Sequence, residues 1–176
     1  MTVSVRPASA ADSAALAVVA AATFPLACPP HTTDEAKAAF IAANLTRAHF
    51  DGYLADPERD LFLAEVDGEP AGYTMLVAGE PYDADVAAAI TVLPTVELSK
   101  CYVMPGHHGA GVAAQLMAAS LDAARARGAA AVWLGVNQEN AKAQRFYAKS
   151  GFARVGTKRF LVGDRWEHDF VLERVF

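Results

Sequence analysis

The chain has 176 residues and 53% of them are hydrophobic, which is enough for one well-filled core and short for two domains. Its 20 acidic and 15 basic side chains give a formal net charge of −5, which argues against a nucleic-acid-binding surface and mildly favours cationic small molecules as partners. No uninterrupted apolar run reaches the roughly 20 residues of a membrane span, and no export signal is evident, so we expect a single cytoplasmic domain over residues 1–176 without a membrane partner.

The N-terminal half is predicted to contain a strand, three helices and a β-hairpin. Pro25 and the Pro29-Pro30 pair are expected to end the first helix and to force a loop over residues 24–30, because proline lacks an N–H donor and has a fixed φ. Asp67-Gly68 predicts the hairpin turn, since both residue types tolerate a positive φ. The expected elements in chain order are a strand at 2–6, helices at 11–22, 33–44 and 46–54, and paired strands at 61–66 and 71–77.

Strands and helices alternate in the C-terminal half. Residues 80–94 are predicted to form a loop or an irregular edge, and such segments often border substrate sites. After them we expect strands at 96–103, 131–136, 152–162 and 166–175, a helix from the glycine-rich segment to about residue 127, and a helix at 139–149. This order of elements indicates an α+β fold with helices on both faces of one sheet.

A glycine loop joins the strand at 96–103 to the helix that follows. Gly109 and Gly111 remove side chains where a ligand could approach the backbone, and the free N–H groups and dipole of a helix start attract phosphate oxygens. A tight strand-to-helix connection also favours glycine. The loop alone therefore leaves open whether this is a pyrophosphate site or only a turn.

Residues 96–152 resemble the GNAT superfamily of acyl-CoA N-acyltransferases on two motifs. The Q/R-x-x-G-x-G/A loop of that family stands here as His108, Gly109, Ala110, Gly111, Val112 and Ala113, with His108 in place of the usual Arg or Gln. The signature N-x-x-A-x-x-[FL]-Y-x-x-x-G-F stands as Asn140, Ala143, Phe146, Tyr147, Gly151 and Phe152. The run WLGV at 133–136 and the C-terminal end are similar to the PaiA-type polyamine acetyltransferases. The resemblance implies a mostly antiparallel, splayed central sheet and acetyl-CoA as the acetyl donor.

The resemblance also implies an acid and a base. Tyr147 matches the phenol that protonates the departing thiolate, although an aromatic residue beside Phe146 would ordinarily be core. Glu97 matches the glutamate that accepts the proton of the acceptor amine, which is almost wholly protonated at neutral pH. The alternative for Glu97 is an exposed position or a pair with Lys100. Other candidate bases are His107, His108, Asp83 and Glu80.

Cofactor contacts are expected along the strand end, the loop and the last helix. The backbone of Cys101, Tyr102 and Val103 is implied to bind the pantetheine arm and to polarise the acetyl carbonyl. Asn140 is implied to hold the cofactor through its amide, with helix capping as the alternative, and Lys149 is a candidate phosphate contact that is otherwise an exposed helix lysine.

Covalent and metal-dependent chemistry are not expected. Cys28 and Cys101 form no C-x-x-C pair and are predicted to be free thiols, and no histidine with an orienting partner can be placed beside Cys101 from the sequence. The adjacent His107 and His108 project in different directions and have no partner at i,i+4, so we expect no metal.

The predicted reaction is transfer of acetyl from acetyl-CoA to a primary amine by direct attack in a ternary complex. A small cation such as a polyamine is the favoured acceptor, and a protein N-terminus or lysine is the alternative. A non-catalytic acyl-CoA-binding regulatory module is a further possibility, against which the presence of Tyr147 and Glu97 argues. The sequence leaves a homodimer open.

Overall fold

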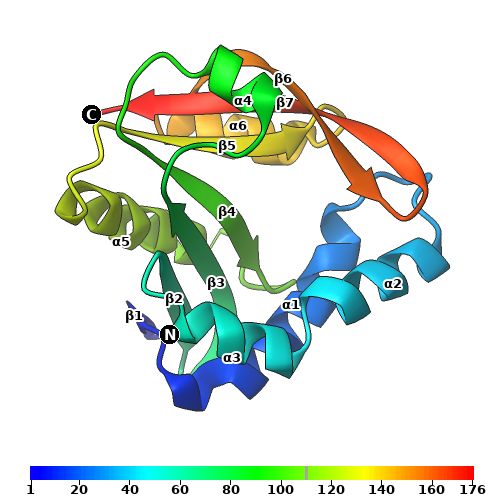
Figure 1. The fold of residues 1–176 in the computed structure, drawn as a ribbon. Coiled ribbons are helices and arrows are strands. Elements are labelled where there is room, and N and C mark those ends of the chain that lie inside the picture. The colour runs from blue at the N-terminus through cyan, green and yellow to red at the C-terminus, as the bar shows by residue number, and fades with distance from the viewer. Residues whose placement is uncertain (110) are drawn as a thin grey trace.

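A seven-stranded sheet with helices on both faces organises the chain in the computed structural model, which describes residues 1–109 and 111–176 (Figure 1). The strand order is β1-β2-β3-β4-β5-β7-β6. The parallel pair is β4 with β5, and the other five pairs are antiparallel. The strands are β1 (Val3–Pro7), β2 (Arg59–Val66), β3 (Glu69–Ala78), β4 (Thr95–Val103), β5 (Ala131–Asn137), β6 (Ala153–Val162) and β7 (Arg165–Val175). The predicted α+β fold is confirmed.

The helices cover the sheet from two sides and enclose separate core clusters. On one side, α5 (Val112–Ala126) and α6 (Ala141–Lys149) pack on a cluster that includes Met117, Leu134 and Phe152. On the other side, α1 (Ser13–Ala27) and α3 (Arg47–Ala55) enclose a cluster that includes Phe50 of α3 and Tyr73 of β3. The chain also forms a 3-10 turn at Ala10–Asp12 and the helix α2 (Asp34–Asn44), which contacts β6.

The segment Ala10–Ala27 is long and apolar enough, by length and composition alone, to cross a membrane. Its apolar side chains Leu16, Val19, Ala20 and Phe24 are buried in the core cluster under α1. Packing on the sheet therefore accounts for part of the hydrophobicity of this segment, whereas Val18 and Leu26 are exposed.

Local sequence signals place several element ends correctly. The side chain of Thr33 caps α2 by accepting the N–H of Ala36 at 3.1 Å, and Thr46 caps α3. Asp67 and Gly68 both have positive φ, at 50° and 85°, and they form the predicted turn between β2 and β3.

The predicted break at Pro25 is wrong, because α1 continues through it to Ala27. Pro25 lies in the last turn, so its missing N–H removes a single helical hydrogen bond near the end of the helix. The carbonyl of Pro25 still accepts the N–H of Cys28 at 3.4 Å, which closes the helix.

The segment 80–94, predicted as loop or irregular edge, contains a short helix, α4 (Ala84–Ala89). Asp83 caps it by accepting the N–H groups of Asp85 at 2.8 Å and Val86 at 3.2 Å. Val86 is fully buried against Trp133 and Val171, so tertiary packing stabilises a helix too short to be evident in the sequence.

The strands β4 and β5 pair at one end and then separate, as Figure 1 shows. Their pairing joins Thr95–Glu97 to Ala131–Trp133. In the pairing of β4 with β3, Lys100 lies opposite Met75 and Leu98 opposite Leu76, so Ser99 is an extra, bulged residue. A bulge reverses the alternation of side chains between the two faces. Glu97 and Lys100 therefore share one face, and Cys101 packs into the core cluster on the other.

Candidate active site

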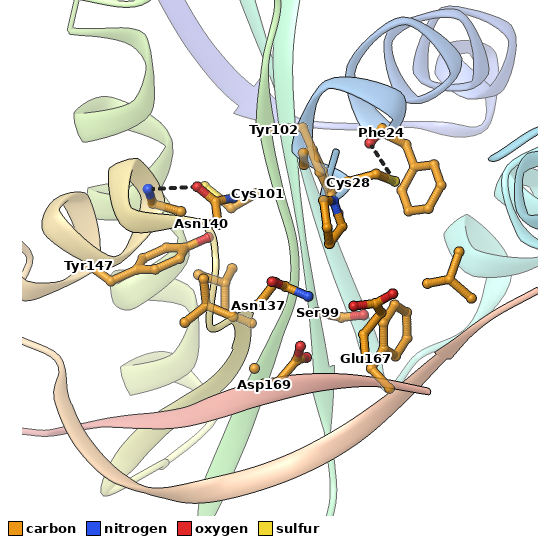
Figure 2. A pocket seen from close by; sticks show the side chains of 18 residues that line it. Phe24, Cys28, Ser99, Cys101, Tyr102, Asn137, Asn140, Tyr147, Glu167 and Asp169 are labelled. Carbon is orange, nitrogen blue, oxygen red and sulfur yellow. Dashed lines mark hydrogen bonds between the residues drawn. The ribbon is translucent and has the colours of Figure 1, made fainter. Parts of the chain in front are cut away.

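Three contiguous cavities follow the gap between β4 and β5 through the sheet. The first, here the loop cavity, has a volume of about 320 Å³ and lies between the end of β4, the glycine loop and the start of α6. The central cavity, of about 170 Å³, lies between β4, β5, α6 and β7 (Figure 2). The third, here the strand cavity, has a volume of about 280 Å³ and lies on the face that carries Glu97 and Lys100. Cys101, Asn140 and Tyr147 border the first two, and Ser99, Gly135 and Asp169 border the last two.

The start of α5 forms one wall beside the loop cavity. Gly109 and Gly111 have φ of 89° and 79°, in the region that favours glycine, and Gly111 caps α5 without a side-chain hydrogen bond. A Cβ atom built on Gly109 would meet no atom within 4 Å in the described chain. The first N–H groups of α5 are therefore suited to an anionic ligand. Val112 is buried and offers its backbone, Ala113 lines the cavity, and Ala110 lies outside the described residues.

Both ring nitrogens of His108 are engaged. Nε2 lies 3.0 Å from the carbonyl oxygen of Val103, and Nδ1 lies 2.8 Å from the Nζ of Lys142. Because a lysine ammonium only donates, Nδ1 accepts and Nε2 carries the hydrogen donated to Val103. Lys142 thus provides a positive charge beside the glycine loop and lines the loop cavity. Lys149 lies in the last turn of α6 and is not among the described residues that line this cavity.

Asn140 and Tyr147 approach the central cavity from α6, as Figure 2 shows. The side chain of Asn140 caps this helix, because its Oδ1 accepts the N–H of Ala143 at 3.1 Å. Burial raises the pKa of Tyr147 well above its usual range, and the neighbouring Cys101 and Tyr102 raise it further. The phenol is therefore protonated at neutral pH and able to donate a proton.

Cys101 does not have the properties of a nucleophile. Burial raises the pKa of its thiol to about 12, although the nearby Tyr147 hydroxyl counteracts part of the shift. A thiol in this state carries almost no thiolate at neutral pH. Cys28 and Cys101 are both free thiols, as predicted.

The strand cavity contains two carboxylates and two ammonium groups. Burial raises the pKa of Glu97, and the charges of Lys158, Lys100 and Arg59 counteract part of this effect. Burial lowers the pKa of Lys100 to about 8. The Nζ of Lys158 lies 3.7 Å from Oδ2 of Asp169. Tyr82, from the segment 80–94, also lines this cavity, as do the apolar side chains of Phe24, Phe40, Leu45 and Phe160.

Sequence reasoning missed the acidic side chains of β7. Glu167, Asp169 and Glu173 are buried at alternate positions of this strand, in line with the buried Val171. Acidic residues at the inward positions of a strand were the signal that could have found them. Among the other candidate bases, Asp83 caps α4, His108 lines the loop cavity, and His107 and Glu80 are not among the described residues lining the three cavities.

His31 lies between two carboxylates, one of which, that of Glu167, lines the central cavity. Its Nε2 is 2.6 Å from Oε1 of Glu167, and its Nδ1 is 3.6 Å from Oε2 of Glu139. The contacts use opposite nitrogens of one ring, so the imidazole links the segment after α1 to β7 and to the start of α6. One nitrogen of His31 and one oxygen of each carboxylate lie within 4.8 Å of one another, which is close enough for a shared metal ion, so the expected absence of a metal stays a prediction.

The sequence profile of the acetyltransferase (GNAT) family matches residues 22–152, which include three of the elements around the central cavity: β4, β5 and α6. The chain belongs to this family. It is an N-acetyltransferase of the GNAT fold, as the two motifs predicted.

Relatives of this GNAT protein support the assignment over most of its length. An uncharacterised N-acetyltransferase of Mycobacterium tuberculosis is 49% identical over 163 residues, which cover 93% of this chain and 97% of the relative. Phosphinothricin N-acetyltransferase of Streptomyces coelicolor is 33% identical over 108 residues, or 60% of each chain. The solved structure of a PaiA N-acetyltransferase from Thermoplasma acidophilum in complex with coenzyme A covers all of both chains with a TM-score of 0.79 and 17% identity, so it supports the fold.

Proposed function

We propose that this N-acetyltransferase binds acetyl-CoA in the loop cavity and transfers acetyl directly to a small primary amine held in the strand cavity. The observation that carries the proposal is the position of Tyr147 and Glu97 in contiguous cavities on the two sides of the β4–β5 gap. The PaiA structure of the same fold contains coenzyme A, which supports this donor. When bound, acetyl-CoA supplies an activated acetyl thioester.

The residues around the loop cavity suit the donor in chemistry and shape. The start of α5 offers backbone N–H groups to a pyrophosphate, and Lys142 adds a positive charge beside them. The edge of β4 from Leu98 to Val103 is not paired with β5 in the described chain, so its backbone is available to the amides of a pantetheine arm. Asn140, Ala143 and Phe146 form the opposite wall.

Glu97 and Tyr147 divide the proton transfers between them. Glu97 accepts a proton from the acceptor ammonium, and its raised pKa makes it a stronger base than an exposed glutamate. The amine nitrogen then bonds to the acetyl carbon, the carbon–sulfur bond breaks, and the nitrogen loses a second proton as the amide forms. Tyr147, which is protonated at neutral pH, donates its phenolic proton to the departing sulfur, and the proton lost by the nitrogen restores the phenol. Asp169, which borders both the central and the strand cavities, is the second candidate base.

The strand cavity, of about 280 Å³, is of a size that favours a small molecule over a protein chain as acceptor. One relative is named for phosphinothricin as its acceptor, which is in keeping with this choice. A polyamine stays a prediction of the sequence. Two lysines line the strand cavity, and they argue against an acceptor that carries only positive charges.

A thiol-release assay with acetyl-CoA and a panel of amines tests the proposal. We expect thiol release only when an amine is present, together with the acetylated amine as product. Mass spectrometry of the protein after incubation with acetyl-CoA alone should show no acetyl-enzyme. Accumulation of an acetylated protein would contradict direct attack, and tight coenzyme A binding without turnover for any amine would indicate a non-catalytic module.

A further inference from the structure

We propose that the acceptor carries a carboxylate as well as its primary amine, and that Lys100 binds the carboxylate. The inference rests on the proposed function, because it assigns the substrate class of the strand cavity. It concerns Lys100 and the charges that surround it in β4, β6 and β7.

The ionisable side chains lining the strand cavity leave one charge of each sign without a close counter-ion. Lys158 and Asp169 are cross-strand neighbours on β6 and β7 at 3.7 Å, and each is more than four-fifths buried, so these two charges compensate. Glu97 and Lys100 have no ion pair within 4.0 Å in the described part of the chain. Both nevertheless line the cavity.

No carboxylate of the described chain forms an ion pair with the Lys100 ammonium within 4.0 Å, and the charge of Glu97 acts on it only from farther away. The Nζ of Lys100 lies 6.0 Å from the ring centroid of Tyr53, and Arg59 stacks on the same ring at 4.9 Å. Arg59 is itself paired with Asp56 at 3.0 Å. A largely buried ammonium without a hydrogen-bonded partner is costly, because desolvation is not repaid by a counter-charge. An acceptor carboxylate would supply that counter-charge.

The bulge at Ser99 makes two-point binding possible. Strict alternation would place Glu97 and Lys100 on opposite faces of β4, but the extra residue brings both to the strand cavity. A molecule with one ammonium and one carboxylate matches this pair, since the ammonium is attracted to Glu97 and the carboxylate to Lys100. A polyamine would bring a further positive charge towards Lys100 and Lys158.

The experiment compares acceptors that differ only in the group remote from the amine. At each chain length from two to six carbons, an unbranched amino acid with a terminal amine is measured beside the diamine and the alkylamine of that length. We expect at least one length at which the amino acid exceeds both others about tenfold or more in kcat/KM. A diamine or alkylamine that matches or exceeds the amino acid at every length would overturn the inference while leaving amine acetylation intact.

Substitution of Lys100 then assigns the contact. Lys100→Met removes the ammonium but keeps an unbranched side chain of similar length, and it should raise KM for the preferred amino acid about tenfold or more, with little change for the alkylamine. Lys100→Gln is measured in parallel in case methionine disturbs the cavity. Arg47→Met, which removes an exposed positive charge at the start of α3, is the control and should leave both KM values unchanged. An unchanged KM for the amino acid in both Lys100 variants would overturn the assignment. Absence of turnover with every amine would instead contradict the proposed function.

Discussion

The ammonium of Lys142 donates a hydrogen bond to Nδ1 of His108 at 2.8 Å and so joins the first turn of α6 to the glycine loop. The other nitrogen of the same imidazole holds the carbonyl of Val103 at the end of β4. His108 thus connects the end of β4, the glycine loop and the start of α6. The ammonium of Lys142 places a positive charge at this junction.

This arrangement predicts different effects for two lysines of the same helix. Lys142→Met should weaken coenzyme A binding roughly tenfold, because it removes the cation beside the loop, and the loss should shrink at high salt. Lys149→Met, at the opposite end of α6, should change the affinity much less. Calorimetric titration of both variants checks this. A larger loss for Lys149→Met would place the phosphates at the far end of the helix.

The helix start itself is tested by Gly111→Glu. The substitution adds bulk and negative charge at the cap of α5, and it also forces a residue with a side chain into a φ of 79°. We expect coenzyme A affinity to fall at least roughly tenfold, or about 1.4 kcal/mol. Gly111→Ala carries the same backbone strain without the charge and is the matched control. Equal affinities for wild type and the folded glutamate variant would show that this helix start does not bind phosphate.

The two sides of the site differed in how far the sequence could predict them. The glycine loop, Asn140 and Tyr147 stand in two motifs within one strand–helix–strand–helix stretch, and the resemblance of these motifs to the GNAT superfamily was enough to group them. The strand cavity needs β4, β6 and β7 together, and Lys158 and Asp169 meet only across strands. The bulge at Ser99 also changes the face of Lys100, which alternation alone would assign to the opposite side from Glu97.

Tyr147→Phe tests the proton donor. The variant keeps the ring that packs near Phe146 and Phe152 but loses the hydroxyl, so the protein should fold normally. We expect kcat to fall roughly 10²-fold with little change in coenzyme A affinity. Steady-state kinetics and calorimetry measure the two quantities. Full activity in the variant would make Tyr147 an ordinary packing residue.

The buried ammonium of Lys100 predicts a pH-dependent stability. Its pKa is about 8 in the folded protein and near 10.5 in the unfolded chain, so the unfolded state binds more protons between these values. The contribution of Lys100 to the free energy of unfolding should therefore rise with pH through this window. Lys100→Met should be more stable than wild type at pH 7, by on the order of 1 kcal/mol because the site is partly open to solvent.

The difference between the two proteins is the quantity to measure, by urea unfolding at several pH values. The advantage of Lys100→Met should shrink as pH rises from about 8 to about 10.5. Cys101, whose pKa is raised to about 12, lowers stability as pH rises above 9, but it does so in both proteins and cancels in the difference. A stability difference independent of pH would mean that Lys100 keeps its ordinary pKa.

Glu97→Gln tests the base, because the rate should depend on an ionised carboxylate acting on an amine that is mostly protonated. In the wild type, kcat/KM should fall as pH drops through the pKa of Glu97, which burial raises above its usual value. The glutamine variant should lose this acidic limb and should be slower at neutral pH. It should recover part of the loss near pH ~9, where more free amine is present. Asp169→Asn, measured alongside, separates the two candidate bases, because only replacement of the true base removes the acidic limb of kcat/KM. Parallel pH profiles with equal rates for Glu97→Gln and wild type would move the base to Asp169.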